Sequence, residues 1–169
     1  AADAVLLAGV ATAGTTTALG VPPGPDHTMA TLAAFGAKIG VADRDDGLRD
    51  IAIEGLPDLR AIDARIPGEP GRAALWLIAG SIVSGSRLTV ENVLLNPWRA
   101  GLLQVLLDMG ADIRVVEQTQ VLGEEVADLM VRHAPLSGTT IDAETTAMAE
   151  EVLPFLVLAA AYASGDTVF

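Results

Sequence analysis

The chain has 169 residues, of which 51% are hydrophobic, so it is long enough and apolar enough to fold around a core. Its 22 acidic and 10 basic residues give a formal net charge of −12, which argues against a nucleic-acid-binding surface of clustered lysines and arginines. It has no cysteine, which excludes disulfides, thiolate catalysis and zinc–thiolate sites.

Helix and strand patterns alternate through the first half of the chain. The apolar run Ala4–Val10 predicts a buried helix that Gly14 ends, and the β-branched Thr15–Leu19 predicts a strand. After a proline-rich turn, His27–Phe35 has apolar residues at helical spacing. We expect Asp26 as the N-cap of that helix and Gly36 just after its end. Two further strands are expected around Ile39–Val41 and Leu48–Ile53, joined by the turn Asp45-Asp46-Gly47.

The second half repeats this order. Ala73–Val83 predicts a second buried helix and Arg87–Leu95 a strand. Asn96-Pro97 is typical of a helix start, with Asn as N-cap and Pro at the first helical position. Two more strands are expected, at Ile113–Val115 and, after an acidic loop Gly123-Glu124-Glu125, at Leu129–Val131. A third apolar helix, which we also expect to be mostly buried, follows at Val152–Ala163.

Two glycine motifs indicate an internal repeat of about 70 to 80 residues. Gly14-Thr15-Thr16-Thr17 corresponds to Gly85-Ser86-Arg87-Leu88, and Phe35-Gly36-Ala37 corresponds to Met109-Gly110-Ala111, in the same order and at nearly the same separation. A third copy begins at Leu153 and reaches Phe169 after one strand. We therefore expect the chain to be a fragment of a larger repeat protein.

Six stretches resemble the enolpyruvyl transferase family, in the order and with the spacing of that family. They are Ala4–Gly9, Asp26-His27-Thr28, Phe35-Gly36-Ala37, Glu91–Pro97, Met109–Ile113 and Val126–Leu129. Within that family they are most similar to 5-enolpyruvylshikimate-3-phosphate synthases of the glyphosate-tolerant class. The resemblance implies an α/β (α+β) fold of repeated βαβαββ-type units, an inside-out α/β barrel that is incomplete here. It also implies two lobes, with residues 1–67 in one and residues 68–169 in the other, truncated in its second unit.

The family reaction implied by this resemblance transfers an enolpyruvyl group from phosphoenolpyruvate to shikimate 3-phosphate, by addition and elimination, without metal or organic cofactor. It needs a general acid and base and several cations around two anions. Lys38 is the single lysine of this chain, so we expect the isolated chain to be inactive. Two alternatives remain: a non-catalytic fragment or scaffold with the same fold, and a UDP-N-acetylglucosamine enolpyruvyl transferase.

Two candidate site residues follow from the resemblance. Glu151, three residues before Pro154, takes the place of a family aspartate that contacts the substrate hydroxyl, and is the candidate catalytic carboxylate. Arg72 is the last residue of Gly68-Glu69-Pro70-Gly71-Arg72, which replaces a family Gly-Asp-x-Ser-Ser stretch, and it is the candidate substrate-binding cation at a helix N-terminus. Glu69 is expected to be a weak cap there, and Pro25 stands where the family often has a phosphate-binding arginine.

The remaining expectations concern metals, partners and location. Glu124, Glu125 and Asp128 are interpreted as a solvated acidic loop and not as a metal site. Nucleic acid is not expected as a partner because the net charge is −12. A membrane is not expected either, because the longest apolar run is shorter than the roughly 20 residues of a membrane span. We expect a cytoplasmic protein whose truncated edge can pair with another chain.

Overall fold

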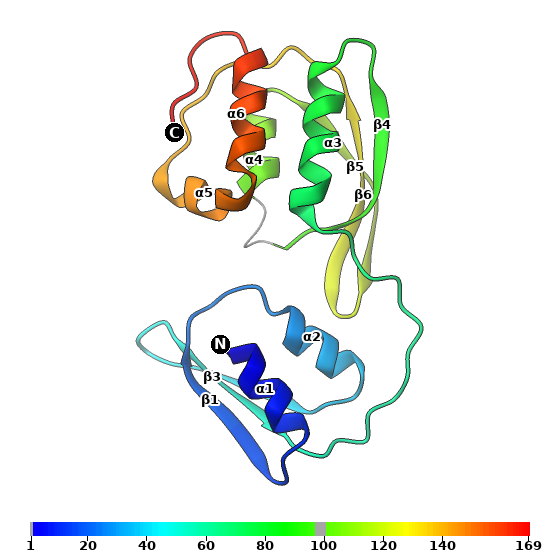
Figure 1. The fold of residues 1–169 in the computed structure, drawn as a ribbon, viewed down its shortest axis with the longest axis vertical. Helices are drawn as coiled ribbons and strands as arrows, with labels where there is room; N and C mark the ends of the chain where they lie inside the picture. Colours follow the sequence, from blue (N-terminus) through cyan, green and yellow to red (C-terminus); the bar gives the residue numbers. More distant parts are fainter. Residues whose placement is uncertain (1, 97–100) are drawn as a thin grey trace. The chain divides into compact units, whose positions relative to one another are not determined.

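The computed structural model describes residues 2–96 and 101–169, apart from the side chains of Met148 and Glu151. The chain divides into two compact units. One comprises Ala1–Arg65 with Leu122–Glu124, and the other comprises Ile66–Val121 with Glu125–Phe169. Each unit combines helices with a three-stranded sheet, which makes the fold α+β, and no closed barrel forms among the described residues (Figure 1).

The first unit places its last strand in the middle of the sheet. Its elements are, in chain order, α1 (Ala2–Val10), β1 (Thr15–Val21), α2 (His27–Ala34), β2 (Ile39–Asp43) and β3 (Arg49–Glu54). The sheet order is β1-β3-β2, and β3 is antiparallel to both neighbours. A small core of Leu6, Ala37, Ile51 and Ile53 joins α1 to the central strand.

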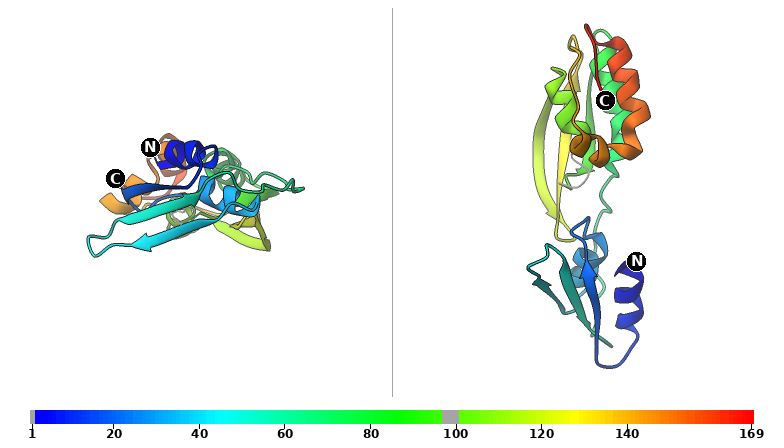
Figure 2. Two further views of the ribbon diagram at one scale, coloured as in Figure 1. Left: turned by 90° about the horizontal axis from the view of Figure 1, so that it is seen from below. Right: turned by 90° about the vertical axis from the view of Figure 1, so that its left-hand side faces the viewer.

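The second unit repeats this order and then adds three helical segments. Its elements are α3 (Pro70–Ile82), β4 (Arg87–Leu94), α4 (Gly101–Asp108), β5 (Asp112–Val121), β6 (Glu124–Arg132), α5 (Ala143–Met148), the 3-10 helix η2 (Glu150–Val152) and α6 (Leu153–Tyr162). The sheet order is β4-β6-β5, again with the last strand in the middle. In the right-hand view of Figure 2, α3 and α6 lie together on one side of this sheet. The predicted repeat of helix, strand, helix and two strands is confirmed.

The repeated glycine motifs have the same backbone geometry in each copy. Gly14, Gly85 and Gly165, which follow α1, α3 and α6, have φ of +89°, +79° and +89°. After α2 and α4, the amides of Ala37 and Ala111 each donate to a carbonyl five residues earlier, at 2.9 Å. This is the Schellman motif at a helix C-terminus, which favours glycine at the residue before the donating alanine, here Gly36 and Gly110. The motifs are therefore repeated backbone turns, which explains why they reveal the internal repeat.

A second glycine pair brings the first helix of each copy against its central strand. A Cβ on Gly9 of α1 would lie 2.6 Å from Cγ2 of Ile53 on β3. A Cβ on Gly80 of α3 would lie 2.5 Å from Cγ1 of Val131 on β6. Gly9 and Gly80 have the same separation along the chain as Gly14 and Gly85. In both copies the helix backbone approaches the sheet too closely for any side chain.

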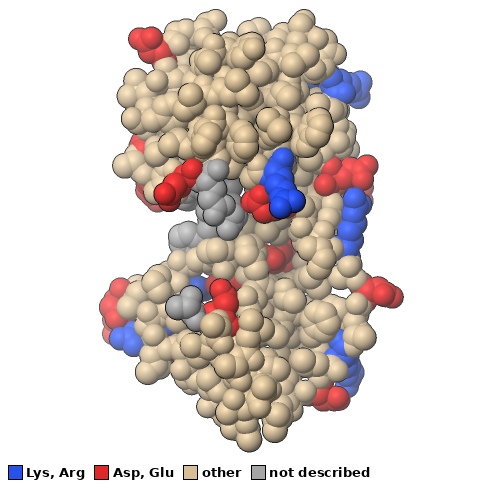
Figure 3. Space-filling view, viewed as in Figure 1, with Lys and Arg blue, Asp and Glu red and all other residues tan. Residues whose placement is uncertain are grey.

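The expected burial of the apolar helices is wrong for two of them. Helix α3 buries seven residues, but α1 buries only Leu6 and Gly9, and α6 buries only Leu156 and Ala159. The reason is that each of these helices forms an outer layer, so only one stripe of it meets the unit's own core. Over α3 and α6 the face drawn in Figure 3 carries few charges. None of the helices among the described residues has the length and apolar character needed to cross a bilayer.

Three local expectations need correction or lie outside the described residues. Glu124 and Glu125 belong to β6 and not to a loop, because the turn is Leu122-Gly123, with φ of +54° and +78° as in a type I′ hairpin. Strand β5 is ten residues long, far longer than the expected Ile113–Val115. The expectation was too short because the polar second half of the strand lacks the alternation of apolar and polar residues that marks a strand. The expected helix start at Asn96-Pro97 falls on residues 97–100, outside the described part.

The close approach at Gly80 gives a test of the packing. We expect Gly80→Ala to lower the free energy of unfolding by about 1 to 3 kcal/mol, because the added methyl overlaps Val131. Val131→Ala opens a small cavity at that place, so the double variant should lose less than the sum of the two single variants. Urea unfolding of the wild type, both single variants and the double variant measures this coupling. Strictly additive losses would contradict the packing described here.

Candidate functional site

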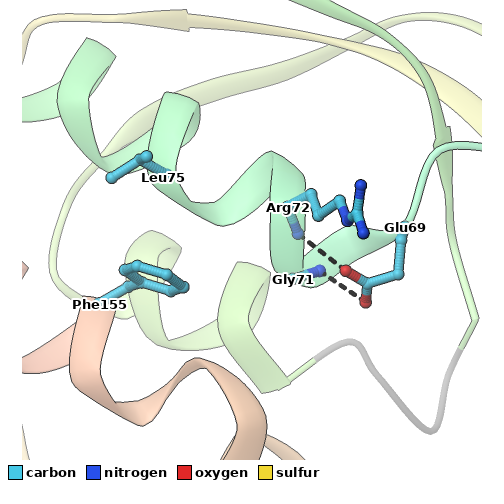
Figure 4. A pocket seen from close by; sticks show the side chains of 5 residues that line it. All are labelled: Glu69, Gly71, Arg72, Leu75 and Phe155. Carbon is cyan, nitrogen blue, oxygen red and sulfur yellow. Dashed lines mark hydrogen bonds between the residues drawn. The ribbon is translucent and has the colours of Figure 1, made fainter.

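The N-terminus of α3 is capped by a glutamate. Glu69 precedes Pro70, which occupies the first helical position, and its carboxylate accepts hydrogen bonds from the amides of Gly71 at 2.9 Å and Arg72 at 2.8 Å (Figure 4). The expectation that Glu69 caps weakly is wrong. Its extra methylene lets both oxygens reach back over the proline to the two free amides, and the negative charge suits the positive end of the helix dipole.

Arg72 lies in the first turn of α3, with an exposed side chain. Figure 4 shows its guanidinium beside the Glu69 carboxylate. Because Glu69 already occupies the amides of Gly71 and Arg72, an anion at this helix end meets the guanidinium and not the backbone donors. An anion also meets the negative charge of Glu69, so the local field is mixed in sign.

These residues line an open cavity of about 400 Å³. Glu69, Gly71 and Arg72 form its polar end, whereas Leu75 of α3 and Phe155 of α6 form its apolar side. A volume of this size falls within the range of small-ligand sites, which combine an apolar wall with a few polar groups. The cavity can therefore hold a small molecule that has an apolar part and a charged group facing Arg72.

The candidate carboxylate Glu151 lies in η2, and its side chain is outside the described part of the chain. Its neighbour can nevertheless be placed. A Cβ built on Gly71 would lie 3.3 Å from Cγ1 of Val152, so the residue before Arg72 touches the residue after Glu151. The fold thus brings together two segments that lie far apart in the sequence, close to the cavity wall formed by Phe155.

Helix α5, which precedes η2, was not expected from the sequence. Asp142 caps it by accepting a hydrogen bond from the amide of Thr145 at 2.7 Å. The hydrogen bonds from Thr145 lower the pKa of Asp142, since they stabilise its charged form. The signal was present as an Asp followed by Glu144 in a first turn, but the helix has only six residues. Helix α5 is followed by the buried Ala149 and then by η2, so α5 helps to position the backbone of Glu151.

The acidic residues interpreted as a solvated loop have a different setting. Asp128 lies in β6, half-buried, and its Oδ1 accepts a hydrogen bond from the amide of Asn92 at 2.8 Å. Among the described residues, no group of three His, Asp or Glu side chains is placed to hold a metal ion.

The segment after Pro25 is held by an ion pair in place of the expected cap. The Asp26 side chain makes no capping hydrogen bond to α2. Its two oxygens instead accept from Nη1 and Nη2 of Arg49 on β3, both at 2.8 Å, and this pairing raises the pKa of Arg49. Arg49 offers the carboxylate two charged donors in a bidentate pair, whereas a cap would offer it a neutral backbone amide, which is why the carboxylate turns toward the strand. Pro25 itself is exposed and has no donor.

Comparison with known proteins decides the family. Residues 1–169 match the family model described as EPSP synthase (3-phosphoshikimate 1-carboxyvinyltransferase). The chain belongs to the EPSP synthase family. This outcome favours that family over the sugar-nucleotide transferases, as the sequence motifs predicted.

Curated and structural relatives agree with this family. Proteins named 3-phosphoshikimate 1-carboxyvinyltransferase from Rhizobium johnstonii and Novosphingobium aromaticivorans are each 44% identical over 166 residues, 98% of this chain. EPSP synthase from Acinetobacter baumannii matches with a TM-score of 0.84 and 31% identity over 97% of the chain. The enolpyruvyl transferase NikO from Streptomyces tendae matches over 96%, with a TM-score of 0.66 and 23% identity, and supports the fold alone.

The chain is much shorter than these relatives. It covers 37% of the Rhizobium johnstonii protein, 38% of the Novosphingobium aromaticivorans protein, 36% of the Acinetobacter baumannii chain and 37% of the Streptomyces tendae chain.

The Glu69 cap gives a stability prediction for this family member. We expect Glu69→Ala to lower the free energy of unfolding by about 1 kcal/mol, because two amides at the start of α3 lose their acceptor. Glu69→Asp should restore part of this, since Asp is a favoured capping residue. Thermal and urea unfolding measure both variants. Equal stability of the wild type and Glu69→Ala would show that the cap contributes nothing.

The Asp142 cap gives a pH prediction. Because hydrogen bonding lowers the pKa of Asp142 in the folded chain, its stabilising effect is present above the unfolded pKa of about 3.9 and is lost as the pH falls through the folded value. We therefore expect Asp142→Ala to be less stable than the wild type near neutral pH and equally stable in strong acid. Asp142→Asn is the control, since its amide oxygen can cap without titrating. A difference that does not change with pH would contradict this.

Proposed function

We propose that this chain supplies part of an enzyme that transfers the enolpyruvyl group from phosphoenolpyruvate to shikimate 3-phosphate. The observation that carries the proposal is the match of the whole chain to the EPSP synthase family model. The relatives are named 3-phosphoshikimate 1-carboxyvinyltransferase, a name that states this transfer for those proteins. Membership of the glyphosate-tolerant class, a cytoplasmic location and pairing with another chain stay predictions.

We assign the two predicted lobes, residues 1–67 and 68–169, to the two compact units. Within the second unit, Arg72 is proposed to face an anionic group of a substrate in the cavity it lines with Phe155. Glu151 is proposed to be the general acid–base group near the substrate hydroxyl. The support is that the segments carrying both residues meet at Gly71 and Val152. No organic or metal cofactor is proposed for this chemistry.

A non-catalytic scaffold with the same fold is the second candidate. The Glu69 carboxylate at the start of α3 favours it, because a negative charge next to Arg72 opposes a second anion. Composition points the same way, since the chain has 10 basic residues against 22 acidic ones. An active enzyme would therefore need cations from segments beyond this chain.

The test separates the chain from the assembled enzyme. We expect the 169-residue chain alone to release no phosphate from phosphoenolpyruvate and shikimate 3-phosphate. Supplied with the remaining segments of the Rhizobium johnstonii relative, it should become active. Turnover by the chain alone near 1 per second would refute the first expectation. No activity after assembly, with folding shown by circular dichroism, would favour the scaffold.

In the assembled enzyme, Glu151→Gln should lower kcat about a hundredfold, as expected for loss of an acid–base group. Glu150→Gln is the matched control, because Glu150 is the exposed neighbour in the same 3-10 helix. Arg72→Ala should raise KM for an anionic substrate by about tenfold, through loss of a charged hydrogen bond. If Glu151→Gln and Glu150→Gln behave alike, the assignment of Glu151 is wrong.

A further inference from the structure

Strand β4 is interrupted by a bulge at Asn92. The pairing of β4 with β6 shifts register between Val90 and Val93, and Asn92 has φ of +58°. This left-handed conformation is unfavourable for most residues, but Asn adopts it more readily than other non-glycine residues. A bulge inside a sheet turns polar groups out of the ladder and can direct them at a neighbouring segment.

Three polar groups of Asn92 make hydrogen bonds. Its amide donates to Oδ1 of Asp128 at 2.8 Å, and its side-chain Nδ2 donates to the carbonyl of Ile66 at 2.8 Å. Its carbonyl accepts from the amide of Gly68 at 2.6 Å. The next residue but one, Leu94, donates its amide to the carbonyl of Gly68 at 2.9 Å. The bulge therefore holds the segment from Ile66 to Gly68 along the edge of β4.

The backbones of Gly68 and Asn92 approach each other closely. A Cβ on Gly68 would lie 3.0 Å from the carbonyl oxygen of Asn92. The residue after Gly68 is Glu69, the cap of α3, and Arg72 follows three positions later. The anchored segment thus ends one residue before the cap that fixes the first turn of α3.

We propose that Asn92 and Asp128 are positioning residues that fix the first turn of α3 and, through it, the Arg72 guanidinium. Asp128 accepts a hydrogen bond from the backbone amide of Asn92 and so stabilises the left-handed conformation of Asn92. The side-chain Nδ2 of Asn92 donates to the carbonyl of Ile66 and so fixes the position of Ile66. The consequence for substrate binding rests on the proposed role of Arg72. The consequence for the backbone does not, so the two can be tested separately. Small displacements of a binding group have large effects on a site that needs fixed geometry.

The first arm measures amide hydrogen exchange in the 169-residue chain. Asn92→Gly keeps access to the left-handed backbone but removes the bond to Ile66, so the amides of Gly71 and Arg72 should exchange about tenfold faster. Asp128→Ala should have a similar effect, whereas Asp128→Asn keeps an oxygen acceptor and should exchange nearly as slowly as the wild type. Arg114→Ala is the matched control, because it removes an exposed hydrogen bond, to Asp112, elsewhere in the unit. Unchanged exchange in Asn92→Gly would overturn the proposal.

The second arm measures kinetics in the assembled enzyme. Asn92→Gly should raise KM for an anionic substrate with little change in kcat, and it should have no further effect when Arg72→Ala is already present. Asp128→Ala should raise KM as well, whereas Asp128→Asn should have a KM close to that of the wild type. A full effect of Asn92→Gly in the Arg72→Ala background would overturn the link to Arg72. If Arg72→Ala alone leaves KM unchanged, the proposed function of Arg72 and its positioning by Asn92 fall together. The exchange result still decides whether Asn92 and Asp128 fix the first turn of α3.

Discussion

The close approach of a helix backbone to the central strand is the constraint on which both units depend. At Gly9 and at Gly80 there is no room for a Cβ against Ile53 and Val131. That contact sets the distance between the helix and the sheet, and hence the size of the side chains that fill the core on either side. It also aligns the helix so that the next turn, at Gly14 or Gly85, returns the chain directly into the edge strand β1 or β4. The two glycines of each copy keep the same spacing because one geometry is built twice.

Features dictated by the backbone could be predicted from the sequence, and features dictated by exposure could not. Glycines at helix ends report a positive φ whatever surrounds them, so Gly14, Gly36 and Gly110 revealed the repeat and the order of elements. The apolar composition of α1 and α6 carried no such information. An apolar helix can lie in the middle of a core or form an outer layer, and only the tertiary arrangement decides which. The polar half of β5 was missed for a related reason, because a strand exposed along most of its length has no buried face to impose alternation.

The candidate site was only partly predictable, because its polar residues choose among several partners. Asp26 is a favoured cap by residue type, but Arg49 on β3 offers it two charged donors. Glu69 is a less favoured cap, yet it bonds two amides because a proline precedes them. Asp128 was taken for a solvated acid and instead bonds the backbone of Asn92. In each case the deciding partner lies far away in the sequence or depends on the local turn, and residue preferences average over such contexts.

The charge at the start of α3 is what separates a binding site from a scaffold in this family member. A helix N-terminus carries roughly half a positive charge, and Glu69 more than neutralises it. An anion placed about equally far from Arg72 and Glu69 gains and loses similar Coulomb energies, about 4 kcal/mol each at 4 Å and an effective dielectric constant of 20. The net attraction is then close to zero, and burial of the anion would make its binding unfavourable.

Binding becomes favourable if the anion displaces the Glu69 carboxylate from the amides of Gly71 and Arg72, or if further cations face the cavity. The first route gives the anion two backbone donors in addition to the guanidinium, which is the stronger arrangement for a phosphate or a carboxylate.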